Sequence, residues 1–76
     1  MKKQVKHEEL QIIGLNVRKI RESQGISRLQ LAFEIGTTER HLARIESGEV
    51  NSGIINFIKL SKSLNVPIYI LFDKLD

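Results

Sequence analysis

Apolar residues along this chain recur at steps of three and four positions, the spacing that places them on one face of an α-helix. The first stripe predicts a helix over residues 8–23, in which Gly14 costs up to ~1 kcal/mol of helix propensity relative to alanine. Its expected inward face consists of Leu10, Ile13, Val17 and Ile20. No segment alternates apolar and polar residues as a half-buried strand would, so the pattern predicts an all-α fold.

Four more short helices follow from the same periodicity and from residues that begin or end helices. Ser27 and Thr38 have hydroxyls that can cap helix N-termini, and Ser27 with Gln30 has the form of a capping box. The expected elements are Ser27 to Gly36, Thr38 to Gly48, Ser52 to Leu64, and a last short turn or helix opened by Pro67. The side chains expected in the core from these elements are Leu31, Ala32, Ile35, Leu42, Ile45, Ile54, Phe57, Leu60, Ser61, Leu64, Ile68, Leu71 and Phe72.

The segment Arg28 to Ser47, RLQLAFEIGTTERHLARIES, has the residue types that a helix-turn-helix requires at the required spacing. Ala32 is small where two steeply crossing helices approach each other, and Gly36 suits a tight turn that needs positive φ. The apolar residues that would fix the crossing angle are Leu31, Leu42 and Ile45. The alternative is an ordinary helical hairpin in a small bundle.

This segment and its flanks resemble the Cro/C1-type (XRE) helix-turn-helix proteins, which include phage repressors and the controller proteins of restriction–modification systems. The resemblance runs from Ile13 to Phe72 and rests on IGLNVRKIRESQGIS, QLAFEIGTTERHLARIESG and FIKLSKSLNVPIYILF. It implies a compact five-helix, lambda-repressor-like domain over residues 1–76 with its motif at about 28–47. It also implies sequence-specific, usually dimeric, DNA binding in transcriptional control.

The resemblance implies roles for individual residues. Arg21 and Glu46 match a pair that ties the first and third helices together in the family. Ser47 matches a position near a phosphate. The positions that reach base edges or nearby backbone are Thr38, Glu39, Arg40 and Arg44.

Two positions depart from the family pattern. Arg28 stands where a glutamine usually contacts phosphate and braces the recognition helix. Arginine retains the phosphate contact and adds charge, with the bracing left open. Ala43 stands where a serine often touches phosphate, so that contact is not expected here.

The third predicted helix has the side chains to contact base edges in a major groove. Arg40 and Arg44 are four residues apart and share a helix face, as do His41 and Arg44 at three. Arginine can bridge guanine O6 and N7, and Glu39 can accept from a cytosine amino group or only stabilise the helix dipole. Phosphate binding remains the alternative for Arg40, and a solvated or phosphate-facing side chain the alternative for His41.

Charge is distributed unevenly along the chain, whose net charge is +3. Residues 1–44 contain nine Lys/Arg and five Asp/Glu, giving +4, whereas residues 45–76 contain three and four, giving −1. Such a division suits a protein that faces a polyanion with one side, although a merely basic, soluble surface is the alternative. Lys2, Lys3 and Lys6 could form a basic arm near DNA or a solvated terminus.

Composition excludes several other classes of protein. The absence of cysteine excludes a disulfide scaffold and a thiolate zinc site, and two histidines are too few for a histidine metal cluster. The chain has no nucleophile–base set or phosphate loop, so we expect no enzyme, no cofactor and no small-molecule ligand. Without a membrane-span-length apolar run or a signal-peptide core, we expect a cytoplasmic protein with no membrane partner.

The C-terminal segment is more apolar than the family pattern requires. VPIYILF runs from Val66 to Phe72 without a charge, and one helix face cannot bury all of these side chains. Tyr69 and Ile70 occupy positions that are usually polar in the family, and Ile55 is apolar where a polar residue is expected. We expect these three residues to form a homodimer interface. An unusually apolar small core is the alternative.

The leading hypothesis is a transcriptional regulator that binds a double-stranded DNA operator with two half-sites as a homodimer. A restriction–modification controller and a phage-type repressor both fit this hypothesis. The alternatives are the antitoxin of a toxin–antitoxin pair, or a protein-interaction adaptor that uses the same fold.

Overall fold

The computed structural model describes residues 7–74 and contains five α-helices in that range. They are α1 (Glu8–Ser23), α2 (Arg28–Ile35), α3 (Glu39–Glu46), α4 (Ile54–Leu64) and α5 (Tyr69–Phe72). Within these residues there is no strand, so the predicted all-α, five-helix fold is confirmed. The described helix α4 begins two residues later than predicted, because the Asn51 side chain accepts a hydrogen bond of 3.0 Å from the Gly53 amide and holds these residues in a turn.

Local hydrogen bonds define the ends of α2 and α3. The hydroxyl oxygens of Ser27 and Thr38 each accept a hydrogen bond of 3.0 Å from the backbone amide three residues later. The Gln30 side chain contacts Glu34 at 3.4 Å rather than reaching back, so only the first half of the predicted capping box forms. Gly36 ends α2 at φ +76°, the left-handed conformation that the tight turn between the two helices needs.

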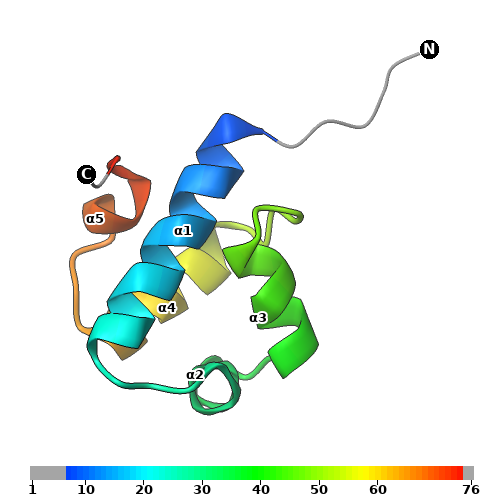
Figure 1. The fold of residues 1–76 in the computed structure, drawn as a ribbon, viewed down its shortest axis with the longest axis vertical. Helices are drawn as coiled ribbons and strands as arrows, with labels where there is room; N and C mark the ends of the chain where they lie inside the picture. Colours follow the sequence, from blue (N-terminus) through cyan, green and yellow to red (C-terminus); the bar gives the residue numbers. More distant parts are fainter. Residues whose placement is uncertain (1–6, 75–76) are drawn as a thin grey trace.

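The helices surround α1, which runs through the middle of the molecule (Figure 1). α1 packs against α3 on one side and α5 on the other, and α4 lies behind it. α2 lies at one end, in contact with α3 and α4. Within residues 7–74 no helix has the length and apolar character needed to cross a membrane.

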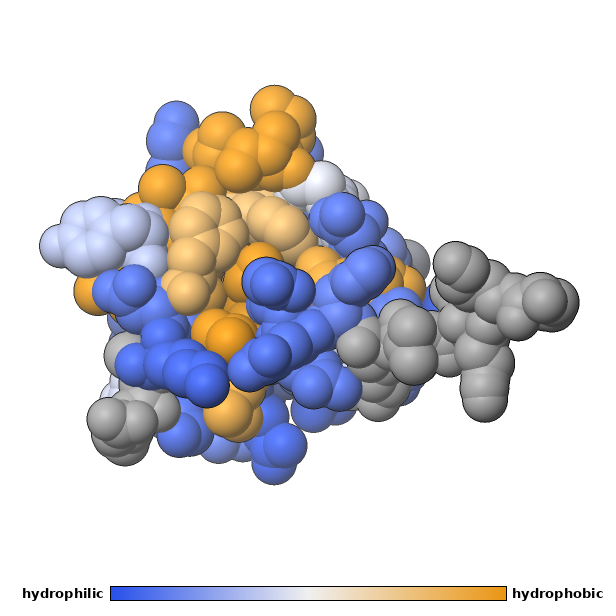
Figure 2. Space-filling view, turned by 90° about the horizontal axis from the view of Figure 1, so that it is seen from above, coloured by the Kyte–Doolittle hydropathy of each residue, from blue (hydrophilic) through white to orange (hydrophobic). Residues whose placement is uncertain are grey.

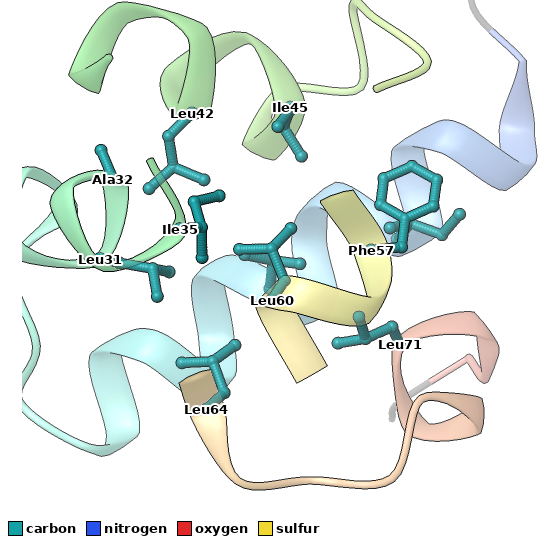
Figure 3. Packing of buried hydrophobic residues seen from close by; sticks show 11 residues of the cluster. Leu31, Ala32, Ile35, Leu42, Ile45, Phe57, Leu60, Leu64 and Leu71 are labelled. Carbon is teal, nitrogen blue, oxygen red and sulfur yellow. The ribbon is translucent and has the colours of Figure 1, made fainter. Parts of the chain in front are cut away.

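The core lies where α2, α3 and α4 converge on α1 and α5 (Figure 3). Its buried apolar side chains are Ile13, Val17, Leu31, Ala32, Ile35, Leu42, Ile45, Phe57, Leu60, Leu64 and Leu71. Leu10, Ile20 and Ile68 are only partly buried at its edge.

The core prediction was wrong at two positions. Ile54, the first residue of α4, is 56% exposed, so the buried face of that helix begins only at Phe57. Phe72 is 44% exposed, although its ring meets the Phe57 ring edge to face at 6.4 Å. Both errors have one cause: periodicity shows which face of a helix is apolar, but not how far along it the neighbouring helices cover that face.

Gly14 permits a close approach between α1 and the end of α3. A Cβ atom placed there would lie 2.3 Å from the carbonyl oxygen of Ile45 and 2.6 Å from that of Glu46. Both are backbone atoms that cannot turn away. In the sequence, Gly14 only lowered the helix propensity of its segment. In the structure, its lack of a side chain sets the distance between α1 and the end of α3.

Two side-chain amides bind the carbonyl groups that helix ends leave unpaired. Buried Asn16 on α1 donates to the Leu71 carbonyl at 2.8 Å and also to those of Ile70 and Asp73. Gln24 donates to the Leu64 carbonyl at 2.7 Å, at the end of α4. These contacts fix α5 and the end of α4 against α1.

Candidate nucleic-acid interface

Helix α3 has one buried side and one exposed side. Leu42 and Ile45 are fully or almost fully buried against the core. Several residues in this region were predicted to bind DNA. The exposed ones are Thr38, Glu39, Arg40, Arg44 and Ser47. The helix therefore presents polar and charged groups to the outside while apolar groups hold it from behind.

One carboxylate anchors the end of α3 to both α1 and α2. Glu46 accepts from Arg21 Nε at 2.7 Å and from a second Arg21 nitrogen at 3.2 Å. It also accepts from Arg28 Nε at 3.2 Å. The side chains of Arg21 and Glu46 are only 8% and 3% exposed, so this paired contact lies inside the protein. The hydrogen bond to Glu46 raises the pKa of Arg21, which is already high, against the opposing effect of burial.

The sequence left open whether Arg28 braces the recognition helix. In the structure it does so through its contact with Glu46. Its side chain is 37% exposed, and its Nε is held by Glu46. A guanidinium has further N–H donors beyond Nε, and these can face a phosphate while Nε stays on the carboxylate. The arginine replaces the family's glutamine as a brace through a charge-assisted bond to the end of α3.

An acidic partner that the sequence did not single out lies in the loop just after α3. Arg44 Nε lies 3.6 Å from Glu49 Oε1. The Ser47 hydroxyl contacts the same carboxylate at 2.8 Å and the Arg44 carbonyl at 3.1 Å. Among residues 7–74, Arg40 has no ion-pair partner. Two exposed arginines therefore share one side of α3, with the more C-terminal one lying next to a carboxylate.

Two further residues of the predicted interface have contacts within the protein. The Thr38 hydroxyl caps α3. His41 is half-buried, and its Nε2 lies 2.9 Å from the Ser52 hydroxyl in the loop before α4. Lys2, Lys3 and Lys6 lie outside the described residues.

Apolar side chains are exposed on α4 and α5. Ile55 and Tyr69 are 63% and 61% exposed, whereas Ile70 is half-buried. Ile54 and Phe72 add to the exposed apolar area of the same two helices. Figure 2, a view from above, shows apolar side chains gathered together and bordered by hydrophilic ones.

The two short helices α2 and α3, joined by a tight turn, have the arrangement of a helix-turn-helix. A helix-turn-helix family model, HTH_3, matches residues 17–71. The chain belongs to the Cro/C1-type (XRE) helix-turn-helix family. It is a DNA-binding transcriptional regulator, which confirms the predicted family and function class.

Solved structures of regulators share this fold over most of their length. The restriction-modification controller protein C.AhdI from Aeromonas hydrophila is 29% identical, with a TM-score of 0.82, and the match covers 87% of this chain and 100% of that chain. SinR, the master regulator for biofilm formation solved in complex with DNA, is 31% identical, with a TM-score of 0.74, over 80% of this chain and 98% of that chain.

A third structure, the hypothetical transcription factor NHTF from Neisseria, shares the fold at 22% identity and a TM-score of 0.83, over 97% of this chain and 85% of that chain. Among curated proteins, none matches the sequence. The family and the similar structures are DNA-binding regulators rather than enzymes.

Proposed function

We propose that this protein regulates transcription as a homodimer, with α3 of each subunit in the major groove of one half-site of an operator. The observation that supports this most directly is the division of α3 into a buried apolar side and an exposed side with Arg40 and Arg44. An α-helix fits the major groove of B-DNA, where arginine can bind guanine through two hydrogen bonds. As a regulator that works on DNA, the protein would act in the cytoplasm, as a single domain.

The proposed contacts with DNA are of two kinds, to base edges and to phosphates. We assign a base contact to Arg44, because it lies on the exposed side of α3. We assign a phosphate contact to Arg28, because Glu46 holds its Nε at the start of α2 and leaves its other donors to solvent. Thr38, Glu39, Arg40 and Ser47 complete the proposed interface around these two residues.

Two arginine variants test this assignment. Arg44→Ala should lower affinity for the cognate site by ~1–3 kcal/mol and relax the preference at one base pair. Arg28→Ala should weaken binding to all sequences alike and reduce the dependence of affinity on salt. Affinities would be measured on the cognate site and a set of single-base variants. Uniform weakening by Arg44→Ala would contradict its assignment to a base.

The proposed dimer contact is the apolar surface formed by Ile55, Tyr69 and Ile70. Ile55→Glu should convert a dimer into a monomer at micromolar concentration, as measured by sedimentation, because it places a charge in the contact. Phe33→Glu is the matched control, since Phe33 is 84% exposed on α2. A wild type that remains monomeric would contradict the dimer and with it an operator whose half-sites lie about 10 bp, or a multiple of that, apart.

Salt dependence separates this function from that of a protein-interaction adaptor. Several phosphate contacts per subunit predict a log–log slope of about 4 to 8 in magnitude for operator affinity against salt concentration. Affinity that does not change with salt would favour the adaptor. A methyltransferase gene or prophage genes beside its own gene would distinguish a restriction–modification controller from a phage-type repressor.

A further inference from the structure

Three polar side chains join the recognition helix to the elements that follow it. His41 lies on α3, Ser52 in the connecting loop and Asn56 on α4. His41 Nε2 lies 2.9 Å from Ser52 Oγ, and Asn56 Nδ2 lies 2.6 Å from the same oxygen. Asn56 Nδ2 also donates to the Ser52 backbone carbonyl at 3.3 Å. The three residues thus form a chain of hydrogen bonds centred on one hydroxyl.

The direction of these bonds follows from which atoms can donate. A carbonyl oxygen only accepts, so the edge of Asn56 that faces Ser52 is its NH₂ group, and this group also donates to Ser52 Oγ. The hydroxyl keeps one proton to donate and one lone pair with which to accept, and either can form the contact with His41 Nε2. A neutral imidazole that accepts at Nε2 has its proton on Nδ1. The Nδ1–H tautomer of His41 is therefore the one in which the Ser52 hydroxyl proton is also bonded within this chain.

The Nδ1 atom reaches the surface. Within residues 7–74, Nδ1 of His41 has no hydrogen-bond partner in the protein, and no side-chain nitrogen or oxygen of a non-exposed residue there is both buried and unpartnered. Nδ1 must therefore be open to solvent. His41 directly follows Arg40 and lies three residues before Arg44, so its Nδ1 atom belongs to the part of α3 with the exposed arginines.

We propose that His41 donates a hydrogen bond from Nδ1–H to an acceptor atom of DNA, and that Ser52 and Asn56 are positioning residues that set the tautomer and orientation of its ring. The acceptor is an oxygen or nitrogen with a free lone pair, on a phosphate or on a base edge. This inference rests on the function proposed above and adds two residues outside α3 to its DNA-binding machinery.

The tautomer can be measured in the free protein by ¹⁵N NMR of the imidazole nitrogens. At a pH where His41 is neutral, we expect the wild type to show a protonated Nδ1 and an unprotonated Nε2. Ser52→Ala should shift the ring toward the Nε2–H form that free imidazole side chains prefer, whereas Ser52→Thr, which keeps the hydroxyl, should not. An Nε2–H tautomer in the wild type would overturn the positioning role.

DNA affinity tests the contact itself. His41→Ala should weaken binding to the cognate site roughly tenfold, the value of about one hydrogen bond, and Ser52→Ala roughly threefold. Ser52→Thr should bind as the wild type does, and Ser52→Ala should cause no further loss when His41 is already alanine. Ser63→Ala is the matched control, because Ser63 is another half-buried serine, and its hydroxyl contacts Glu34 rather than His41.

The pattern of loss identifies the acceptor. A loss confined to variants at one base pair would indicate a base, and an even loss with a weaker salt dependence would indicate a phosphate. Unchanged affinity of His41→Ala for DNA that the wild type binds would overturn this inference and leave the proposed function intact. A wild type that binds no DNA at any salt concentration would overturn the proposed function itself.

Discussion

Replacing Gly14 with alanine sets helix propensity against packing. In an exposed helix the change would stabilise the protein, because alanine is favoured over glycine by ~0.8–1.0 kcal/mol. Here the added Cβ would lie 2.3 Å from the Ile45 carbonyl oxygen, whereas real Cβ contacts are essentially never shorter than 3.0 Å. Because the atoms it meets are backbone, α1 and the end of α3 must move apart.

The magnitude follows from the two opposing terms. Overpacking of a core costs ~1–3 kcal/mol, and a clash with three backbone atoms belongs at or above the upper end of that range. After the gain in propensity, we expect a net loss of about 2 kcal/mol. For a domain of this size that loss lowers Tm by about 8–16 °C. Urea unfolding followed by far-UV circular dichroism measures the free energy directly.

A matched glycine separates steric clash from backbone strain. Gly25 has φ +70°, but a Cβ there would meet no atom within 4 Å, so Gly25→Ala should cost only the ~1 kcal/mol of a left-handed alanine. Gly14→Ala should also weaken DNA binding, because it displaces the end of α3, whereas Gly25→Ala should not. A Gly14→Ala protein as stable as the wild type, or more stable, would refute the argument from close packing.

Three further predictions concern buried polar groups. Glu46→Ala leaves the Arg21 guanidinium buried without its carboxylate and should lower the free energy of unfolding by ~3–5 kcal/mol in urea titrations; a loss below about 1 kcal/mol would show that the pair is dispensable. The stability difference between wild type and Arg21→Met should stay constant from about pH 7 to pH 10. The bond to Glu46 raises the pKa of Arg21, and a group with a raised pKa loses its contribution to stability only above its unfolded-state pKa, which for arginine lies above this interval. A steady decline of the difference in paired denaturation curves would contradict this prediction. Asn16→Asp replaces a side-chain amide donor with a carboxylate that faces the Leu71 carbonyl, and it should speed hydrogen exchange of the backbone amides in α5. Unchanged exchange would show that the Asn16 side chain does not hold this helix.

The parts of the fold that depend on nearby residues could be predicted from the sequence. The caps at Ser27 and Thr38 and the turn at Gly36 involve groups within a few positions of one another, so their signals are local. Contacts between distant segments could not be predicted in the same way. Nothing near Asn16 in the sequence indicates that its amide meets the carbonyl of Leu71, 55 residues away.

The same distinction between local features and distant contacts applies to the candidate site. The arginines of α3 could be singled out from their spacing, because residues four apart share a helix face whatever surrounds them. Their surroundings could not, since Glu49 beside Arg44 and Ser52 beside His41 depend on the path of the loop between α3 and α4.

The sequence by itself determined that this chain is helical, that a helix-turn-helix lies within residues 28–47, and which family it belongs to. Those properties follow from periodicity and capping, which act over one or two helical turns. Only the tertiary structure decided how closely α1 approaches α3 at Gly14, which apolar side chains stay uncovered, and that Glu46 binds Arg28 in addition to Arg21. These outcomes depend on the relative placement of whole helices, which is fixed when their buried faces pack together and not by any one segment.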